Sequence, residues 1–274
     1  MEMENVIPTE NKARETLFSL FSGKRMLFIV ILFAISLIMQ IISAATSESG
    51  LGAIAELLDS FMEDGSGELR SLVNTIDNII KIVNFILLIP LALYTLSVLF
   101  FYIGGKKYDK TKVSLGAKFF KIYNIIYMVY YGLCMAGIAI IGVVLCIIFA
   151  EIGESVVLPI ILCLVFIGIV YLIASLYTKS FIMARGISDV MQTGKNQLYV
   201  FKYVIFMNWL MGIGAILGGI GNGIVALISG VLIGLTYIFI ATIFSSYKKE
   251  MGLPSKEEMS NAPSLQKLAN KYKK

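Results

Sequence analysis

The chain alternates between long apolar stretches and shorter polar ones. A bilayer core is about 30 Å thick, so about 20 residues of apolar α-helix cross it. Six stretches approach or exceed this length, at residues 26–45, 79–103, 122–150, 157–178, 203–220 and 224–247. A membrane β-barrel would need alternating strands of about ten residues, which unbroken runs such as Leu27–Met39 exclude. The pattern predicts an all-α, polytopic membrane protein with six transmembrane helices over residues 26–247.

The polar segments between these stretches change the sign of their charge at successive crossings. Residues 104–121, 179–202 and 248–274 carry net charges of +5, +3 and +4, whereas residues 46–78 carry −6. Basic segments stay on the cytoplasmic side of a membrane. Both termini are therefore predicted to lie inside the cell, with 21 of the 23 Lys and Arg residues. The sequence pI of about 8.9 then reflects topology and gives no indication of nucleic-acid binding.

Three polar segments have features of their own. Residues 1–25 carry an apolar patch before the first span, which predicts an amphipathic helix in the inner interface, with a simple extension of that span as the alternative. In the outer loop, 46–78, residues 51–63 place apolar side chains on one arc and acidic ones opposite, which predicts an amphipathic helix. Residues 248–274 are highly charged and contain two prolines, which predicts a basic, mostly disordered tail with a short helix at 264–272.

The composition excludes several classes of chemistry. The chain has no histidine, which rules out a Ser–His dyad, an H-E-x-x-H zinc site and His-ligated haem. No Asp or Glu lies within a predicted span, so coupling to protons or Na⁺ through a buried carboxylate is not expected. A P-loop is also missing from the sequence. We therefore predict a protein that is not an enzyme and that holds no cofactor and no catalytic or structural metal.

Neutral polar side chains remain within the spans. Tyr123, Tyr127 and Tyr130 share one face of the third span, Asn208 lies in the fifth, and Asn222 lies between the fifth and sixth. These five residues are candidates for lining a polar cavity or passage. The alternative interpretation is an interfacial aromatic belt that merges into hydrogen bonds between helices.

The last two spans are rich in glycine, which lets helices approach closely within lipid. Six glycines form pairs four residues apart and are predicted to pack these two helices together: Gly214 with Gly218, Gly219 with Gly223, and Gly230 with Gly234. The alternative is a re-entrant segment at residues 218–223 whose backbone lines a cavity.

Six spans, two internal termini and basic inner loops resemble the layout of the six-span permease subunits of export ABC transporters. This resemblance is one of architecture, without a shared motif, and it implies a cytoplasmic partner such as an ATPase subunit. The candidate docking residues on the inner loops are Lys106, Lys107, Lys110 and Arg185. We predict a non-catalytic permease-type or accessory subunit in the lipid bilayer.

Other functions and settings fit the same layout. One alternative is a stand-alone, uncoupled channel or facilitator, and another is a structural, sensing or immunity-type membrane protein. A homo-oligomer is compatible with all three. The absence of glycosylation sequons from the outer loops and the Ile-, Lys- and Asn-rich composition favour a bacterial cell membrane.

Overall fold

The computed structural model describes residues 11–46, 86, 88–152, 155–220 and 224–263, and every regular element among them is a helix. Six of these helices are long and apolar enough to cross a membrane: Lys24–Ile42, Leu88–Lys106, Lys110–Glu151, Val157–Thr193, Lys202–Gly219 and Leu227–Met251. The prediction of an all-α chain with six candidate spans is therefore confirmed. The amphipathic helix predicted at 51–63 lies outside the described residues.

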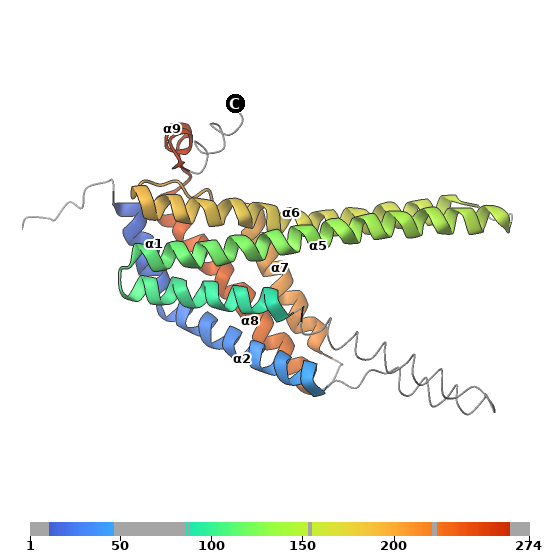
Figure 1. The fold of residues 1–274 in the computed structure, drawn as a ribbon, viewed down its shortest axis with the longest axis horizontal. Helices are drawn as coiled ribbons and strands as arrows, with labels where there is room; N and C mark the ends of the chain where they lie inside the picture. The colour runs from blue at the N-terminus through green and yellow to red at the C-terminus, as the bar shows by residue number, and fades with distance from the viewer. Residues whose placement is uncertain (1–10, 47–85, 87, 153–154, 221–223, 264–274) are drawn as a thin grey trace, which may run out of the picture.

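The helices pack mainly as neighbours along the chain. Helix α5 (Lys110–Glu151) pairs with α6 (Val157–Thr193), and α7 (Lys202–Gly219) pairs with α8 (Ile224–Met251). Helix α2 (Lys24–Thr46) packs on α8. The helix Leu88–Lys106 is the unlabelled blue-green helix between α5 and α2 in Figure 1. The α5–α6 pair extends well beyond the other labelled helices.

The inner segments are largely helical, which corrects the prediction of loops at 104–121 and 179–202. Only residues 107–109 and 194–201 lie outside helices there, because α5 begins at Lys110 and α6 continues to Thr193. Helix α5 has 42 residues, so it is about 63 Å long, roughly twice the thickness of a bilayer core. Lysine favours helix formation as well as leucine does, so charge marks the edge of the membrane and not the end of the helix.

The most buried core lies where these helical extensions meet the N-terminal segment. Leu17, Val113, Ile187 and Tyr247, from four different helices, are each at most 1% exposed. Toward the opposite end of α5, apolar residues such as Leu133 are more than half exposed. Large apolar side chains exposed over a whole helix pair suit a lipid environment, so the polypeptide packs against itself chiefly at one end.

Helix α1 (Lys12–Ser22) is a separate element and not an extension of the first span. The chain breaks at Gly23, which has an extended conformation with φ −69° and ψ 161°. The apolar face of α1 is covered by protein, since Phe18 is 5% and Phe21 is 2% exposed. Phe21 also stacks on Phe101 with ring centroids 4.6 Å apart. The amphipathic helix therefore buries its apolar face in the bundle, where the prediction placed that face in the membrane interface.

Part of the C-terminal tail is ordered, which differs from the prediction of a mostly disordered segment. Helix α9 (Lys256–Ser260) starts at a capping box in which Ser255 and Glu258 satisfy each other's backbone N–H groups. Gln197 Nε2 donates to the carbonyl oxygen of Glu258 at 3.1 Å, which ties the tail to the segment after α6. The helix predicted at 264–272 lies outside the described residues.

Glycines allow α7 and α8 to pack in close contact. A Cβ atom added to Gly212 would lie 2.8 Å from the Gly234 carbonyl oxygen, and one added to Gly230 would overlap the carbonyl oxygen of Ala215. Gly219 lies against Gly230 in the same interface. The predicted pair Gly214 and Gly218 is elsewhere, because no atom lies within 4 Å of a Cβ added to either residue.

Helix α7 is continuous to Gly219, so Gly218 and Gly219 are helical and are not part of a broken segment. Positions 212 and 219 are seven residues apart and therefore share a face, whereas 214 is rotated about 200° from 212. Gly223, the sixth predicted packing glycine, lies outside the described residues.

This packing makes a matched pair of glycine substitutions informative. Gly234→Ala is expected to lower the free energy of unfolding by about 1–3 kcal/mol, because the new methyl group meets the backbone of α7. Gly214→Ala is expected to raise it by up to about 1 kcal/mol, because alanine favours the helix and meets nothing. SDS titration of the purified protein measures both values. Equal effects of the two substitutions would contradict the close contact.

Candidate functional site

A tight turn joins the helix Leu88–Lys106 to α5 at the basic end of the bundle. Asp109 begins α5, and its carboxylate accepts hydrogen bonds from the backbone N–H groups of Thr111 and Lys112 at 2.9 and 3.2 Å. The N–H of Asp109 donates to the carbonyl oxygen of Gly104 at 2.8 Å, which closes the preceding helix. The helix end and the helix start are thus fixed within three residues.

Tyr108 occupies the left-handed conformation in this turn. Its φ of +51° is positive, which among the described residues other than glycine is found only here. Glycine is the usual residue at such a helix end, because a side chain costs about 1 kcal/mol there. Tyr108 is 69% exposed and touches Phe18 of α1 edge-on, with ring centroids 5.5 Å apart. An aromatic side chain is therefore presented at the tip of the turn.

The structure brings three of the four predicted docking residues together on this turn. Lys106, Lys107 and Lys110 are all exposed and surround Tyr108 in the sequence. Arg185 belongs to a different group, because its guanidinium lies 4.4 Å from the ring centre of Phe181, which Lys121 also approaches. Lys121 lies about three turns further along α5 than Lys110.

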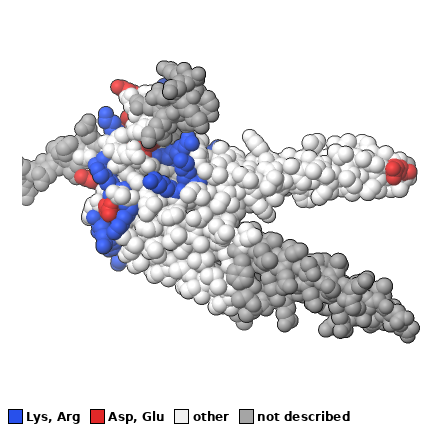
Figure 2. All heavy atoms as spheres, in the orientation of Figure 1, with Lys and Arg blue, Asp and Glu red and all other residues white. Residues whose placement is uncertain are grey.

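Figure 2 shows how the charges are distributed on one face of the molecule. Lys and Arg atoms gather at the end that carries α1, the turn and the start of α5. The rest of the α5–α6 pair is uncharged on this face until its tip, where Glu151 ends α5. The described charges therefore lie at the ends of the helices and leave an apolar band between them.

A polar cavity lies between four helices within this apolar band. It has a volume of about 140 Å³. Its lining comes from α2, the helix Leu88–Lys106, α5 and α8, and comprises Phe33, Ser36, Gln40, Leu91, Tyr94, Tyr123, Tyr127, Ile233, Thr236 and Tyr237. None of these side chains is charged at neutral pH, and six of them carry a hydroxyl group.

Stacked tyrosines form one side of the cavity. The rings of Tyr94 and Tyr123 stack with centroids 4.4 Å apart, and those of Tyr127 and Tyr177 stack at 4.7 Å. Tyr123 and Tyr127 are also in contact, at 4.8 Å. The rings therefore form a continuous aromatic wall that runs from the helix Leu88–Lys106 across α5 to α6.

The predicted cavity-lining residues are divided by the structure. Tyr123 and Tyr127 line the cavity, whereas Tyr130 is 47% exposed and is not part of the lining. Asn208 is buried, and its Nδ2 donates to the carbonyl oxygen of Val204 at 2.7 Å within the same helix. Asn222 lies outside the described residues.

Sequence reasoning missed the other polar lining residues. Ser36 and Gln40 are four residues apart on α2, and Thr236 reaches the same cavity from α8. The available signal was the helical spacing of Phe33, Ser36 and Gln40, which places them on one face. Single polar residues in apolar spans are too common for that spacing to be distinctive.

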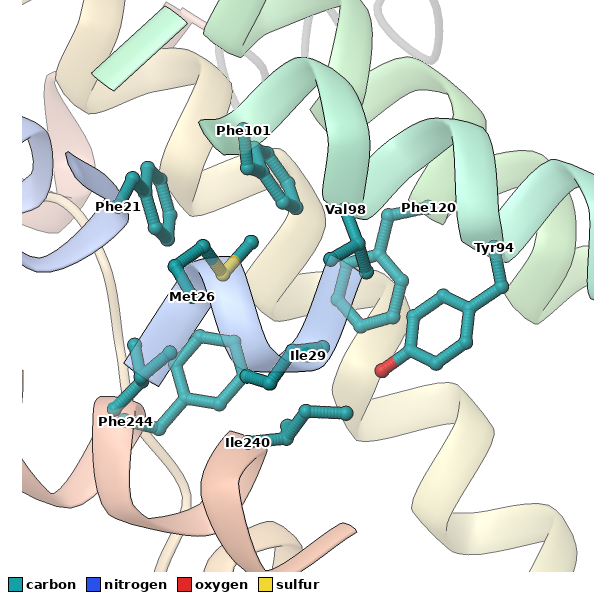
Figure 3. A pocket seen from close by; sticks show the side chains of 10 residues that line it. Phe21, Met26, Ile29, Tyr94, Val98, Phe101, Phe120, Ile240 and Phe244 are labelled. Atoms are coloured by element: carbon teal, nitrogen blue, oxygen red, sulfur yellow. The ribbon is translucent and has the colours of Figure 1, made fainter. Parts of the chain in front are cut away.

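A second, smaller cavity of about 30 Å³ lies nearer the basic end, and Figure 3 shows its lining. Phe21, Met26, Phe101 and Phe244 approach it from four helices, so its surface is apolar. Apolar voids of this size stay dry, and we regard it as a gap in the packed core. Tyr94 lies at its edge, with its hydroxyl directed between α2 and α8 (Figure 3).

Comparison of the chain with protein-family models, with curated proteins and with solved structures found no match. Among the described residues, no three His, Cys, Asp or Glu side chains are grouped so that they could hold a metal ion. The basic turn and the polar cavity are therefore the two features that bear on function.

The conformation of Tyr108 can be tested by two substitutions at the same position. Tyr108→Gly is expected to be more stable than Tyr108→Ala by about 1 kcal/mol, because both lose the Phe18 contact but only glycine adopts positive φ without strain. At Ser19, an exposed position within α1, the order is expected to reverse, because alanine is the better helix former. Equilibrium unfolding of the four variants provides the comparison. The same order at both positions would contradict the turn geometry.

Proposed function

We propose that the protein is a non-catalytic, multi-pass subunit of a cell membrane that works with a separate cytoplasmic protein docked on its basic turn. The proposed topology places both termini inside the cell. The proposed partner is an ATPase subunit or another cytoplasmic protein with an acidic surface. The observation that carries the proposal is the exposed aromatic and basic turn at residues 106–110.

The distribution of charge supports the proposed orientation. The described Lys and Arg side chains gather at one end in Figure 2, and basic segments stay on the cytoplasmic side of a membrane. The helical extensions of α5 and α6 begin or end there, so part of each helix projects beyond the bilayer core. A cytoplasmic partner would therefore meet a packed surface of helices.

The turn has the features of a docking site. Tyrosine is enriched among residues that dominate binding energy, and Tyr108 is exposed at the tip. Lys106, Lys107 and Lys110 supply positive charge around it, which speeds encounter with an acidic partner and selects against basic ones. The turn is held from behind, because a Cβ atom on Gly105 would meet the backbone of Phe21 in α1 at 2.8 Å. A rigid site loses little conformational entropy on binding.

The sequence supports the non-catalytic part of the proposal. Without histidine, and without acidic residues inside the spans, the chain offers no nucleophile–base pair in the membrane. The energy for any active process would then come from the partner.

A second candidate function is a stand-alone, uncoupled facilitator, which is favoured by one observation. The cavity of about 140 Å³ places hydroxyl groups between four candidate spans. Flux of small solutes into liposomes that contain only this protein would support that function. The basic turn plays no part in it.

Charge reversal tests the docking site directly. The triple variant Lys106→Glu, Lys107→Glu and Lys110→Glu is expected to weaken co-purification of the cytoplasmic partner at least about tenfold, because attraction becomes repulsion. Wild-type association is also expected to weaken as salt rises. Mass spectrometry of proteins that co-purify in mild detergent measures both effects.

The matched control reverses three exposed lysines at other positions: Lys12→Glu, Lys249→Glu and Lys256→Glu. This variant has the same net charge as the first and is expected to retain the partner. Equal loss in both triple variants would indicate non-specific attraction, and retention in both would remove the turn from the docking site.

The proposed orientation is tested by cysteine labelling in a variant that lacks the three native cysteines. A cysteine in place of Glu151 is expected to react with a membrane-impermeant maleimide in intact cells, because the tip of the α5–α6 pair lies outside in the proposed topology. A cysteine in place of Ser260, in α9, is expected to react only after permeabilisation. The opposite pattern would invert the topology and contradict cytoplasmic docking at the turn.

A further inference from the structure

Two buried hydroxyl groups face the polar cavity without a partner. Ser36 and Tyr94 are each 8% exposed, and both line the cavity. Neither hydroxyl makes a hydrogen bond to another described residue. Thr236, in the same lining, differs because its hydroxyl donates to the carbonyl oxygen of Leu232 at 2.8 Å. Ser36 and Tyr94 therefore leave hydrogen-bonding capacity directed at the cavity.

Such groups are costly within a membrane. A buried hydroxyl without a hydrogen bond costs about 1–3 kcal/mol. Lipid chains offer neither donors nor acceptors. The cavity therefore favours an occupant that carries a hydrogen-bonding group of its own.

The size and the walls of the cavity restrict that occupant. A volume of about 140 Å³ is close to the roughly 150 Å³ cavity that takes up benzene in another protein. Phe33, Leu91 and Ile233 supply apolar surface, and the tyrosine rings supply aromatic surface for edge or offset stacking. No described lining residue is charged at neutral pH, so an ion would lose its hydration without a counter-charge from these residues.

We propose that this cavity binds a small uncharged molecule with a hydroxyl group on an aromatic body of about the size of phenol. The hydroxyl of the ligand pairs with Ser36 and Tyr94, and its ring lies against the apolar and tyrosine walls. Exposed Gln40 lies at the edge of the lining, where a molecule dissolved in the membrane can enter. The inference does not depend on partner docking, because the purified protein alone tests it.

Fluorine NMR of the full-length protein in lipid nanodiscs measures the binding. The two probes are 4-fluorophenol and fluorobenzene, which differ in the hydroxyl group, and empty nanodiscs of the same lipid correct for partitioning. We expect saturable binding of both probes, with 4-fluorophenol bound about 3- to 10-fold more tightly, as one net hydrogen bond predicts.

Paired substitutions assign the binding to the cavity. Tyr94→Phe is expected to reduce the preference for 4-fluorophenol by about 3-fold or more, whereas Tyr130→Phe, outside the lining, leaves it unchanged. Thr236→Phe adds four side-chain heavy atoms inside the cavity and is expected to abolish binding of both probes. Thr178→Phe is its matched control, because Thr178 makes the same hydrogen bond four residues back but is exposed on α6.

Three results would overturn the proposal. No binding beyond empty nanodiscs would mean that the cavity holds water only. Equal affinity for the two probes would remove recognition of the hydroxyl. An undiminished preference in Tyr94→Phe would place the binding site elsewhere, and this comparison remains decisive where Thr236→Phe fails to fold.

Discussion

Polar side chains within a bilayer must find their hydrogen-bond partners in the protein, and this constraint organises the structure. Five residues meet it by donating to the carbonyl oxygen four positions back in their own helix: Thr95, Asn124, Thr178, Asn208 and Thr236. These local bonds require no neighbouring helix. The helices are thus free to pack through apolar and small residues, as α7 and α8 do. Ser36 and Tyr94 are not satisfied in this way, and they meet at one cavity.

The number and type of the helices could be predicted from the sequence, because an apolar stretch of about 20 residues rarely forms anything but a spanning helix. The ends of the helices could not. Gly116 stays within α5 because a Cβ atom there would lie 2.9 Å from the carbonyl oxygen of Ser97, so glycine serves a close approach and not a break. The hydroxyl of Ser97 also donates to the carbonyl oxygen of Gly116 at 2.8 Å. Such contacts depend on a neighbouring helix, which a single-helix pattern does not reveal.

The same difference applies to the candidate sites. Tyr123 and Tyr127 could be singled out from their shared helical face, and Lys106, Lys107 and Lys110 from the positive charge of an inner segment. The inward direction of Ser36 depends on how α2 is rotated against α8, and the exposure of Tyr108 depends on a positive φ. Residue type and spacing thus indicate which side chains have a chemical capacity. Tertiary packing decides which of them meet.

One helix takes part in both sites. The helix Leu88–Lys106 contributes Tyr94 to the cavity and, about 18 Å further along, Lys106 to the basic turn. Aromatic side chains of α1 and α2 follow this helix and its turn at three levels, through the pairs Phe33–Tyr94, Phe21–Phe101 and Phe18–Tyr108. Close-packed aromatic contacts resist independent displacement. A partner that displaced the turn and a molecule held beside Tyr94 would therefore act on the same helix, and any difference in its position would enter both binding free energies equally.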